Sequence, residues 1–318
     1  MQIDRSRSNL SWADKSVLIL DSATLQKRLA PDSPFLPDGC EHEVFPWLLP
    51  EIRQAIIVIA FVTQVGGSVV DSFEAFLSLG DSMSIDKYPV RDMESRQIKL
   101  DTREIGAASL FFKNDSSLYP EFEGKDLCTI YPGIKYHNLS EDGYTSEDVL
   151  DLNLNLVSDL KELKTLITLT CGGNDLITLH MRGQAEQNRI AYFEQEMKEL
   201  QVRYDRILSK LIEKFPIILS TVYDPTDGTG VFPGNILEGD IPIEYIGRFN
   251  DFIHQIAKYT KEFLVADIHK HFLGHGMKSG TVSDFWYFML NPIEPSATGA
   301  SEIRRVWLDV LKINVWTF

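Results

Sequence analysis

Cysteine is scarce in this chain, with only Cys40, Cys128 and Cys171 among 318 residues. The number is odd and no two of them form a C-x-x-C pair, which argues against a disulfide scaffold. Unpaired thiols are typical of a protein kept in a reducing compartment, so we expect a cytoplasmic location. Cys171 ends an apolar run and is expected to be a small core residue, not a reactive thiol.

Long hydrophobic runs are missing as well. The longest spans residues 55–62. It is far shorter than the ~20 residues that a membrane helix needs, so we interpret it as a buried strand and expect no membrane span. The first ten residues carry charges of both signs and no apolar core, unlike a secretory signal.

Positive charge is also in deficit. The formal net charge is −15 at pH 7. A surface of this sign repels polyanions, so we expect neither nucleic acid nor an anionic membrane as a partner. A small molecule is the expected partner. The sequence leaves the oligomeric state open.

Short strand-like runs alternate with amphipathic helical stretches from residue 73 onward. The strand-like runs lie at residues 76–79, 134–139, 166–170, 217–222 and 263–268. The main helical stretches lie at residues 146–163, 184–214, 243–262 and 296–312. This alternation is typical of a parallel sheet with helices on both faces. We therefore predict an α/β protein: a three-layer α/β/α sandwich with a flavodoxin-like parallel sheet of about five strands.

Two regions fall outside this repeat. Residues 1–72 are predicted to be an N-terminal extension that packs on the core domain, residues 73–318. Residues 84–123 form a polar, loop-rich insertion between the first two core strands, with residues 105–112 as its one compact piece. An insertion at this place fits a substrate-binding lid and a loop without function equally well.

The most informative segment is F-L-S-L-G-D-S at residues 76–82. An apolar run ends in a Gly-Asp turn and Ser82 follows at once, which is how an α/β fold presents a nucleophile. The same pattern is also typical of a plain turn with a helix cap. A second segment, L-I-T-L-T-C-G-G-N-D at residues 166–175, places Asn174 just past another strand. Because ligands bind at the carboxyl ends of parallel strands, we expect Ser82 and Asn174 to share a site.

These segments resemble the SGNH, or GDSL, hydrolase family, whose members are recognised by four sequence blocks. Residues 80–83 (G-D-S-M) resemble block one, residues 138–145 resemble block two with Gly143 at its glycine, and residues 172–175 (G-G-N-D) resemble block three. The resemblance implies an esterase that needs no cofactor. Ser82 would be its nucleophile, and the N–H groups of Ser82 and Gly143 and the Asn174 amide its oxyanion hole.

The chemistry of ester hydrolysis asks for the same groups. The reaction passes through a tetrahedral oxyanion, and each preorganised donor aimed at it contributes about 3–4 kcal/mol. A glycine such as Gly143 lets bare backbone approach the substrate. An asparagine such as Asn174 supplies a neutral N–H donor that needs no titration.

Block five of the family, D-x-x-H-P before the final helix, is altered in this chain. Asn291 stands at the aspartate position, Glu294 stands at the histidine position, and Pro295 matches the proline. A serine hydroxyl is a poor nucleophile without an adjacent base. Glu294 could itself accept the serine proton if apolar surroundings raise its pKa.

Histidine offers another route to a base. Asp267, His269, His271 and His275 lie together in A-D-I-H-K-H-F-L-G-H-G, at and past the fifth strand. They fit capping residues, a metal site or the source of the base. We predict His275 in preference to Glu294, because imidazole titrates near neutrality and flanking glycines give it freedom of approach. A helix N-terminus just after Glu294 would also depress the pKa of that carboxyl.

The sequence therefore predicts a serine hydrolase that cleaves a carboxylic ester or thioester through an acyl-enzyme on Ser82. The alternative is a binding protein of the same fold that has lost its base and retains only the pocket. Labelling by a serine-directed phosphonate would separate the two. Nothing in the sequence identifies the acyl group or the alcohol.

Overall fold

The computed structural model describes residues 73–152, 160, 163–211, 216–232, 242–281 and 285–315. The predicted extension, residues 1–72, lies outside these residues, as does the strand expected at residues 55–62. The helix expected at residues 146–163 is described in its first part and at its end.

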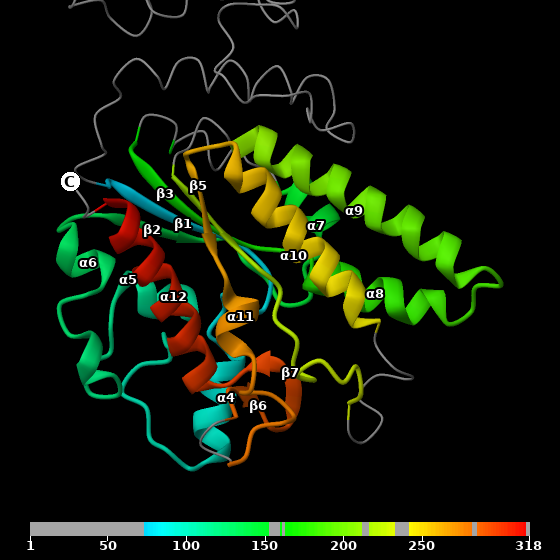
Figure 1. Cartoon of the computed structure of the whole chain (residues 1–318). Coiled ribbons are helices and arrows are strands. Elements are labelled where there is room, and N and C mark those ends of the chain that lie inside the picture. Colours follow the sequence, from blue (N-terminus) through cyan, green and yellow to red (C-terminus); the bar gives the residue numbers. More distant parts are fainter. Residues whose placement is uncertain are drawn as a thin grey trace, which may run out of the picture. The chain divides into compact units, whose positions relative to one another are not determined.

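A five-stranded parallel sheet forms the centre of the fold, which confirms the predicted α/β class. Its strands are β1 (Ala75–Gly80), β2 (Lys135–Asn138), β3 (Thr165–Thr170), β4 (Ile217–Ser220) and β5 (Phe263–Ala266). Their order across the sheet is β2-β1-β3-β4-β5, and every neighbouring pair is parallel (Figure 1). The strand order reverses between β1 and β3, which is where sheets of this kind bind ligands.

Helices cover both faces of the sheet (Figure 1). On one face lie α7 (Ser146–Asp151), α8 (Gly173–Gly183), α9 (Arg189–Leu211) and α10 (Ile243–Lys258). On the other lie α5 (Ala107–Phe112), α6 (Leu127–Ile130), α11 (Ile268–Phe272) and α12 (Ala297–Val315). The described residues thus form the three layers that the sequence predicted.

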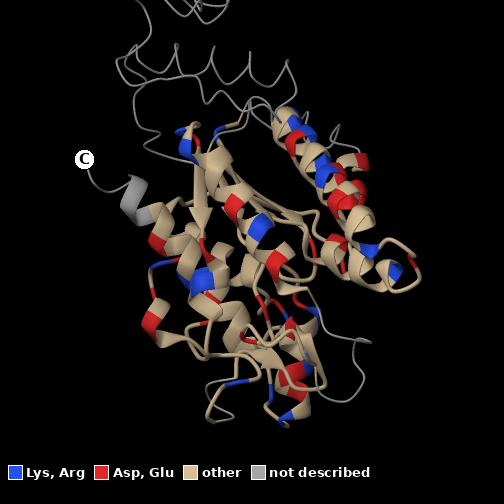
Figure 2. Ribbon diagram, turned by 45° about the vertical axis from the view of Figure 1, so that its right-hand side comes forward, with Lys and Arg blue, Asp and Glu red and all other residues tan. Residues whose placement is uncertain are grey.

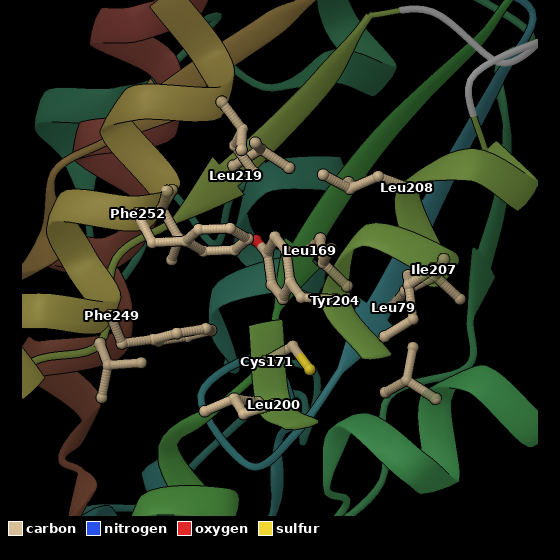
Figure 3. Packing of buried hydrophobic residues seen from close by; sticks show 14 of the residues in the cluster. Leu79, Leu169, Cys171, Leu200, Tyr204, Ile207, Leu208, Leu219, Phe249 and Phe252 are labelled. Carbon is tan, nitrogen blue, oxygen red and sulfur yellow. The ribbon is translucent and has the colours of Figure 1, made fainter. Parts of the chain in front are cut away.

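The alternation of side chains along the strands explains the two helical layers. In β1, Leu77 and Leu79 pack with α9 and α10, whereas Phe76 packs with α5 and α12 on the opposite face. A strand buried on both faces reads as a continuous apolar run. Figure 3 shows the first of these clusters, in which Tyr204 of α9 and Phe249 of α10 meet edge to face at 5.4 Å.

Charged residues lie mainly in the helices and loops (Figure 2). Within the five-stranded sheet, the only charged side chain belongs to Lys135 of β2, at the sheet edge. None of the described helices is both long enough and apolar enough to cross a membrane. A carboxylate that is buried without hydrogen-bond partners calls for a chemical explanation.

The insertion at residues 84–123 differs from the expected loop, because it contains α4 (Lys87–Ser95), α5 and a 3-10 turn, η2 (Pro120–Phe122). Long-range contacts stabilise it. The buried guanidinium of Arg304, on α12, stacks on the ring of Phe122 at 3.5 Å and donates to Asn114 Oδ1 at 2.7 Å. Contacts across some 190 positions are not visible in local sequence patterns.

Three further differences from the predicted elements are an additional helix, an additional pair of strands and a shorter β5. Helix α8 begins at the second glycine of the G-G in the second motif, where no helix was expected. A short antiparallel pair, β6 (Tyr287–Phe288) and β7 (Asn291–Pro295), precedes the last helix. Strand β5 ends two residues early, because the Asp267 side chain accepts a hydrogen bond from Lys270 N and so caps α11.

Candidate active site

Ser82 lies in the tight turn that follows β1. Gly80 has a φ of +131°, and a Cβ there would lie 1.7 Å from the carbonyl oxygen of Thr170, so only glycine fits. Asp81 N donates to Thr170 Oγ1 at 3.2 Å, and Asp81 Oδ1 accepts from Met83 N at 3.1 Å. These contacts fix the turn and leave Ser82 only 7% exposed.

Gly143 lies in the loop between β2 and α7, beside the same strand end. Glu141 N donates to Gly80 O at 3.1 Å, and both Gly143 and Ser82 lie two residues beyond this hydrogen bond. Gly143 has a φ of +81°, and no described atom lies within 4 Å of the place where its Cβ would be. Its backbone is therefore open to a ligand.

Asn174 is the second residue of α8. The helix starts after Gly172, which has a φ of +108° and packs so closely on Phe249 that a Cβ would lie 2.2 Å from the ring. Asn174 Nδ2 donates to the carbonyl oxygen of Tyr144 at 2.9 Å, which places the amide next to Gly143. Because an amide NH₂ has two hydrogens, one remains for a ligand.

Asp175 holds the start of α8 in place. Its carboxylate accepts from Ser146 N at 2.8 Å and from Ser146 Oγ at 2.6 Å. Arg203 of α9 lies 3.2 Å from the same carboxylate. This network joins α7, α8 and α9 and so fixes the backbone next to Asn174.

Glu294 of β7 brings a carboxyl group to Ser82. It is 8% exposed, and the Ser82 side chain lies close enough to lower its pKa. Its second oxygen, Oε2, is buried without a hydrogen-bond partner among the described residues. Burial raises the pKa of Glu294 to about 7, and the negative charges of Asp81 and Asp142 act in the same direction. The Ser82 side chain and the Lys87 charge oppose the shift.

The expected depression of the Glu294 pKa by a helix N-terminus does not occur. Glu294 lies in a strand, three residues before α12 begins at Ala297. The N–H group of Ala297 donates to Asp92 Oδ2 at 3.1 Å, so another carboxylate occupies the helix terminus. Desolvation of Glu294 therefore decides the direction of its pKa shift.

The strand that carries Glu294 is fixed on both sides of it. Tyr223 Oη donates to Ile293 O at 2.8 Å. Ser296 donates to Trp286 O through both N and Oγ, each at 2.9 Å. The Glu294 side chain thus extends from a backbone with little freedom.

Asp81 is a second buried carboxylate in the site. Burial raises its pKa to about 6, although hydrogen bonds from Met83 and Thr170 partly offset the effect. It adds a negative charge next to Glu294. Protonation of Glu294 relieves the repulsion between the two.

His275 lies apart from this group. Its ring stacks on the ring of Trp286, with centroids 3.4 Å apart and an interplanar angle of 8°. A Cβ on Gly276 would lie 2.3 Å from a backbone carbonyl oxygen, so this flanking glycine is packed and not free. His275 does not line the pocket that contains Ser82. Glu294 does not line it either, but the Ser82 side chain lies close enough to Glu294 to affect its pKa.

The other residues of the histidine segment have separate partners. His271 Nε2 lies 2.8 Å from Glu302 of α12, and Asp267 lies 3.6 Å from His254 of α10. The backbone N–H of His269 donates to a threonine hydroxyl at 2.9 Å. No group of three or more His, Cys, Asp or Glu side chains that could hold a metal ion is found in the part of the chain that the structure describes.

An apolar pocket of about 70 Å³ adjoins Ser82 and Asn174. Asp81 and Asp224 also contribute to its lining. The apolar lining comes from the strand ends, α8 and α10: Met83, Leu176, Ile177, Leu179, Val222, Tyr223, Pro225, Phe232, Pro242, Tyr245, Ile246 and Ile293. Such a lining suits an apolar part of a substrate.

Three residues that the sequence did not single out border the site on another side. Tyr88 Oη donates to both carboxylate oxygens of Asp142, at 3.0 and 3.1 Å. Lys87 Nζ forms an ion pair with the same carboxylate. Asp142 precedes Gly143, whereas Lys87 and Tyr88 open α4 in the insertion. No motif marked them, because only the fold brings α4 to the loop after β2.

A family model described as the GDSL-like Lipase/Acylhydrolase family matches residues 106–300. The chain belongs to this family. The match covers Gly143, Asn174 and Glu294 and begins after Ser82. Membership confirms the resemblance seen in the sequence and makes the protein an ester-hydrolysing enzyme of the GDSL type.

Solved structures of other hydrolases are similar to this GDSL-type enzyme. The lipase Lip_vut3 from a goat rumen metagenome is 15% identical, with a TM-score of 0.50 over 74% of this chain and 96% of that one. Axe2, an acetylxylan esterase from Geobacillus stearothermophilus, is 18% identical, with a TM-score of 0.46 over 77% and 96%. No curated protein matches the chain.

Proposed function

We propose that this GDSL-type enzyme hydrolyses a carboxylic ester or thioester through an acyl-enzyme on Ser82, with Glu294 as the general base. The proximity of the Ser82 hydroxyl to the buried Glu294 carboxyl carries the proposal. A carboxyl group with a pKa of about 7 is largely ionised just above neutral pH and is basic enough to accept a proton there.

The reaction has two halves. Ser82 Oγ attacks the carbonyl carbon while its proton passes to Glu294, and the oxyanion binds the N–H groups of Ser82 and Gly143 and the Asn174 amide. When the carbonyl re-forms, the bond to the leaving group breaks and Glu294 returns the proton to the alcohol or thiol. A water molecule then attacks the acyl group with Glu294 again as base, and Ser82 leaves with the proton.

A glutamate base also explains the change at position 291. An imidazole becomes a cation when it accepts a proton, so it benefits from an orienting carboxylate. Glu294 becomes neutral instead, and Asp81 and Asp142 already raise its pKa. A further carboxylate at Asn291 would add a like charge without an imidazolium to stabilise. The alternative of a binding protein without a base is not favoured, since Glu294 supplies one.

The apolar pocket is the proposed acyl site. It is lined by Ser82 and Asn174 and by side chains of α8 and α10, which are almost all apolar. Burial of each methylene there contributes about 0.8 kcal/mol. We therefore propose substrates with a short, apolar acyl chain.

The direct test of this function is to trap the acyl-enzyme. The enzyme is mixed with p-nitrophenyl butyrate, quenched in acid within the first turnovers, digested and analysed by mass spectrometry. A butyryl group on the peptide that contains Ser82 supports the proposal. Turnover without any acylated peptide, or acylation at another residue, contradicts it.

Asn174→Ala should lower kcat by about 10²–10³-fold, because the free hydrogen of its amide is proposed to bind the oxyanion. KM should change little, since the contact forms in the transition state. Steady-state kinetics on an aryl ester measure both constants. A raised KM with kcat intact would instead identify Asn174 as a ground-state contact.

Ile177→Trp should shorten the acyl chain that the enzyme accepts. Ile177 lines the pocket from α8, so an indole there would fill space that the acyl chain needs. The ratio of kcat/KM for hexanoyl over acetyl esters should fall at least about 10-fold. Ile190→Trp is the control, because Ile190 is 73% exposed on α9 and does not line the pocket. An equal ratio in the two variants would place the acyl chain elsewhere.

A further inference from the structure

Asp142 is a partly exposed carboxylate that two side chains of α4 hold in place. It directly precedes Gly143, and about a third of its side chain is exposed. Two donors from α4 nevertheless hold it: the Tyr88 hydroxyl, at 3.0 and 3.1 Å, and the Lys87 ammonium group. We call Lys87, Tyr88 and Asp142 the α4 clamp.

Helix α4 is itself firmly placed. Before its first turn, Asp86 accepts from Gly106 N at 2.6 Å and from Ser109 Oγ at 3.1 Å, both at the start of α5. At its other end, Asp92 accepts the hydrogen bond from α12. Tyr88 is buried to 7% exposure, and its ring lies 6.3 Å from that of Phe288. Its hydroxyl is thus a fixed donor and not a mobile surface group.

The loop that contains Gly143 lacks such rigidity of its own. Gly143 is exposed, has a positive φ and has open space on the side where a Cβ would lie. Its neighbours are held by Glu141 N on Gly80 O before it and by Asn174 on Tyr144 O after it. In the proposed mechanism the N–H group of Gly143 faces the oxyanion. This group belongs to the peptide between Asp142 and Gly143, and the α4 clamp holds that peptide on the Asp142 side.

We propose that Tyr88, with Lys87, is a positioning residue that orients the Asp142–Gly143 peptide so that its N–H group points at the oxyanion. This inference rests on the proposed function of Ser82. The ammonium group of Lys87 also offsets the negative charge of the Asp142 carboxylate, which would otherwise oppose the developing oxyanion. Exposed ion pairs add little to folding stability, so positioning is the better explanation of this arrangement.

Proximity to Glu294 agrees with this role. The charge of Glu294 contributes to the raised pKa of Tyr88, after burial. Asp142 and Lys87 in turn act on Glu294 with opposite signs. The clamp is therefore close enough to the reacting groups to matter for the charge that develops there.

The test compares Tyr88→Phe with Tyr192→Phe, which removes the hydroxyl of a tyrosine on α9, outside the site. Both enzymes are assayed with p-nitrophenyl acetate and with a small alkylboronic acid that forms a tetrahedral adduct on serine. Tyr88→Phe should lower kcat about 10- to 100-fold and change KM less than about 3-fold. The affinity for the boronic acid should fall by the same factor as kcat/KM. Tyr192→Phe should match the wild type in all three.

Variants of Asp142 keep the inference testable if Tyr88→Phe is unstable. Asp142→Asn retains an oxygen that accepts from Tyr88, so it should keep more of kcat than Asp142→Ala. If Tyr88→Phe behaves like Tyr192→Phe, or Asn and Ala at position 142 are equivalent, the clamp does not position Gly143, while the Ser82 mechanism stands. If wild-type turnover does not depend on Ser82, both proposals fall together.

Discussion

Glu294→Gln should lower kcat/KM for an aryl ester by about 10²–10⁴-fold near pH 8, because glutamine keeps the shape of the side chain but cannot accept the Ser82 proton. KM should change little. Stopped assays over several substrate concentrations separate the two constants. Glu123→Gln, which alters an exposed carboxylate in the insertion, is the matched control and should retain full activity.

The same variant should also be more stable than the wild type at pH 8. The pKa of Glu294 is raised in the folded protein to about 7 from 4.5, so the folded state holds this proton more tightly than the unfolded state. Wild-type stability therefore falls as pH rises from about 4.5 to about 7, and the full penalty remains above that range. Glutamine has no charge to bury. A higher melting temperature at pH 8 shows that lost activity is not lost folding.

His275→Ala completes this comparison. The stacking on Trp286 gives His275 a packing role, so we expect turnover within a few-fold of wild type and a lower melting temperature. If His275→Ala removes turnover and Glu294→Gln does not, histidine is the base after all.

Ser82→Ala should abolish ester hydrolysis, with a loss of at least about 10³-fold in kcat. The melting temperature should stay within a few degrees of wild type, because the change removes one oxygen from a turn fixed by Gly80 and Asp81. Ser209→Ala, at an exposed position of α9, is the control. Unchanged turnover in Ser82→Ala would remove the nucleophile assignment.

The central sheet could be predicted from the sequence because its strands are buried on both faces. Continuous apolar runs such as those of β1 and β3 admit few other interpretations. Helix α8 is not predicted by the sequence pattern because two glycines, Gly172 and Gly173, stand at its start. That start depends on the packing of Gly172 against Phe249, some 77 residues away. The insertion was assigned to loop for a similar reason, since α12 stabilises it from a distant part of the chain.

The sequence predicted where the site residues lie, at the ends of strands, but it did not identify the base. Ser82, Gly143 and Asn174 follow three neighbouring strands, and the parallel sheet brings them to one edge. The proposed choice of Glu294 over His275 depends on burial, which a sequence does not contain. Desolvation raises the pKa of Glu294, and the stack on Trp286 holds His275 away from the pocket lining.

The most direct measurement is the rate at which a fluorophosphonate modifies Ser82 as a function of pH, in wild type and in Glu294→Gln. Attack on phosphorus needs the serine hydroxyl and its base. Unlike the alcohol of an ester, the leaving group of a fluorophosphonate does not have to be protonated. In wild type the rate should rise with pH, with a midpoint of about 7, and the adduct should map to Ser82. In Glu294→Gln the rate should be far lower and the midpoint near 7 should be lost. An unchanged rate and midpoint in that variant, or an adduct on another residue, would contradict activation of Ser82 by Glu294.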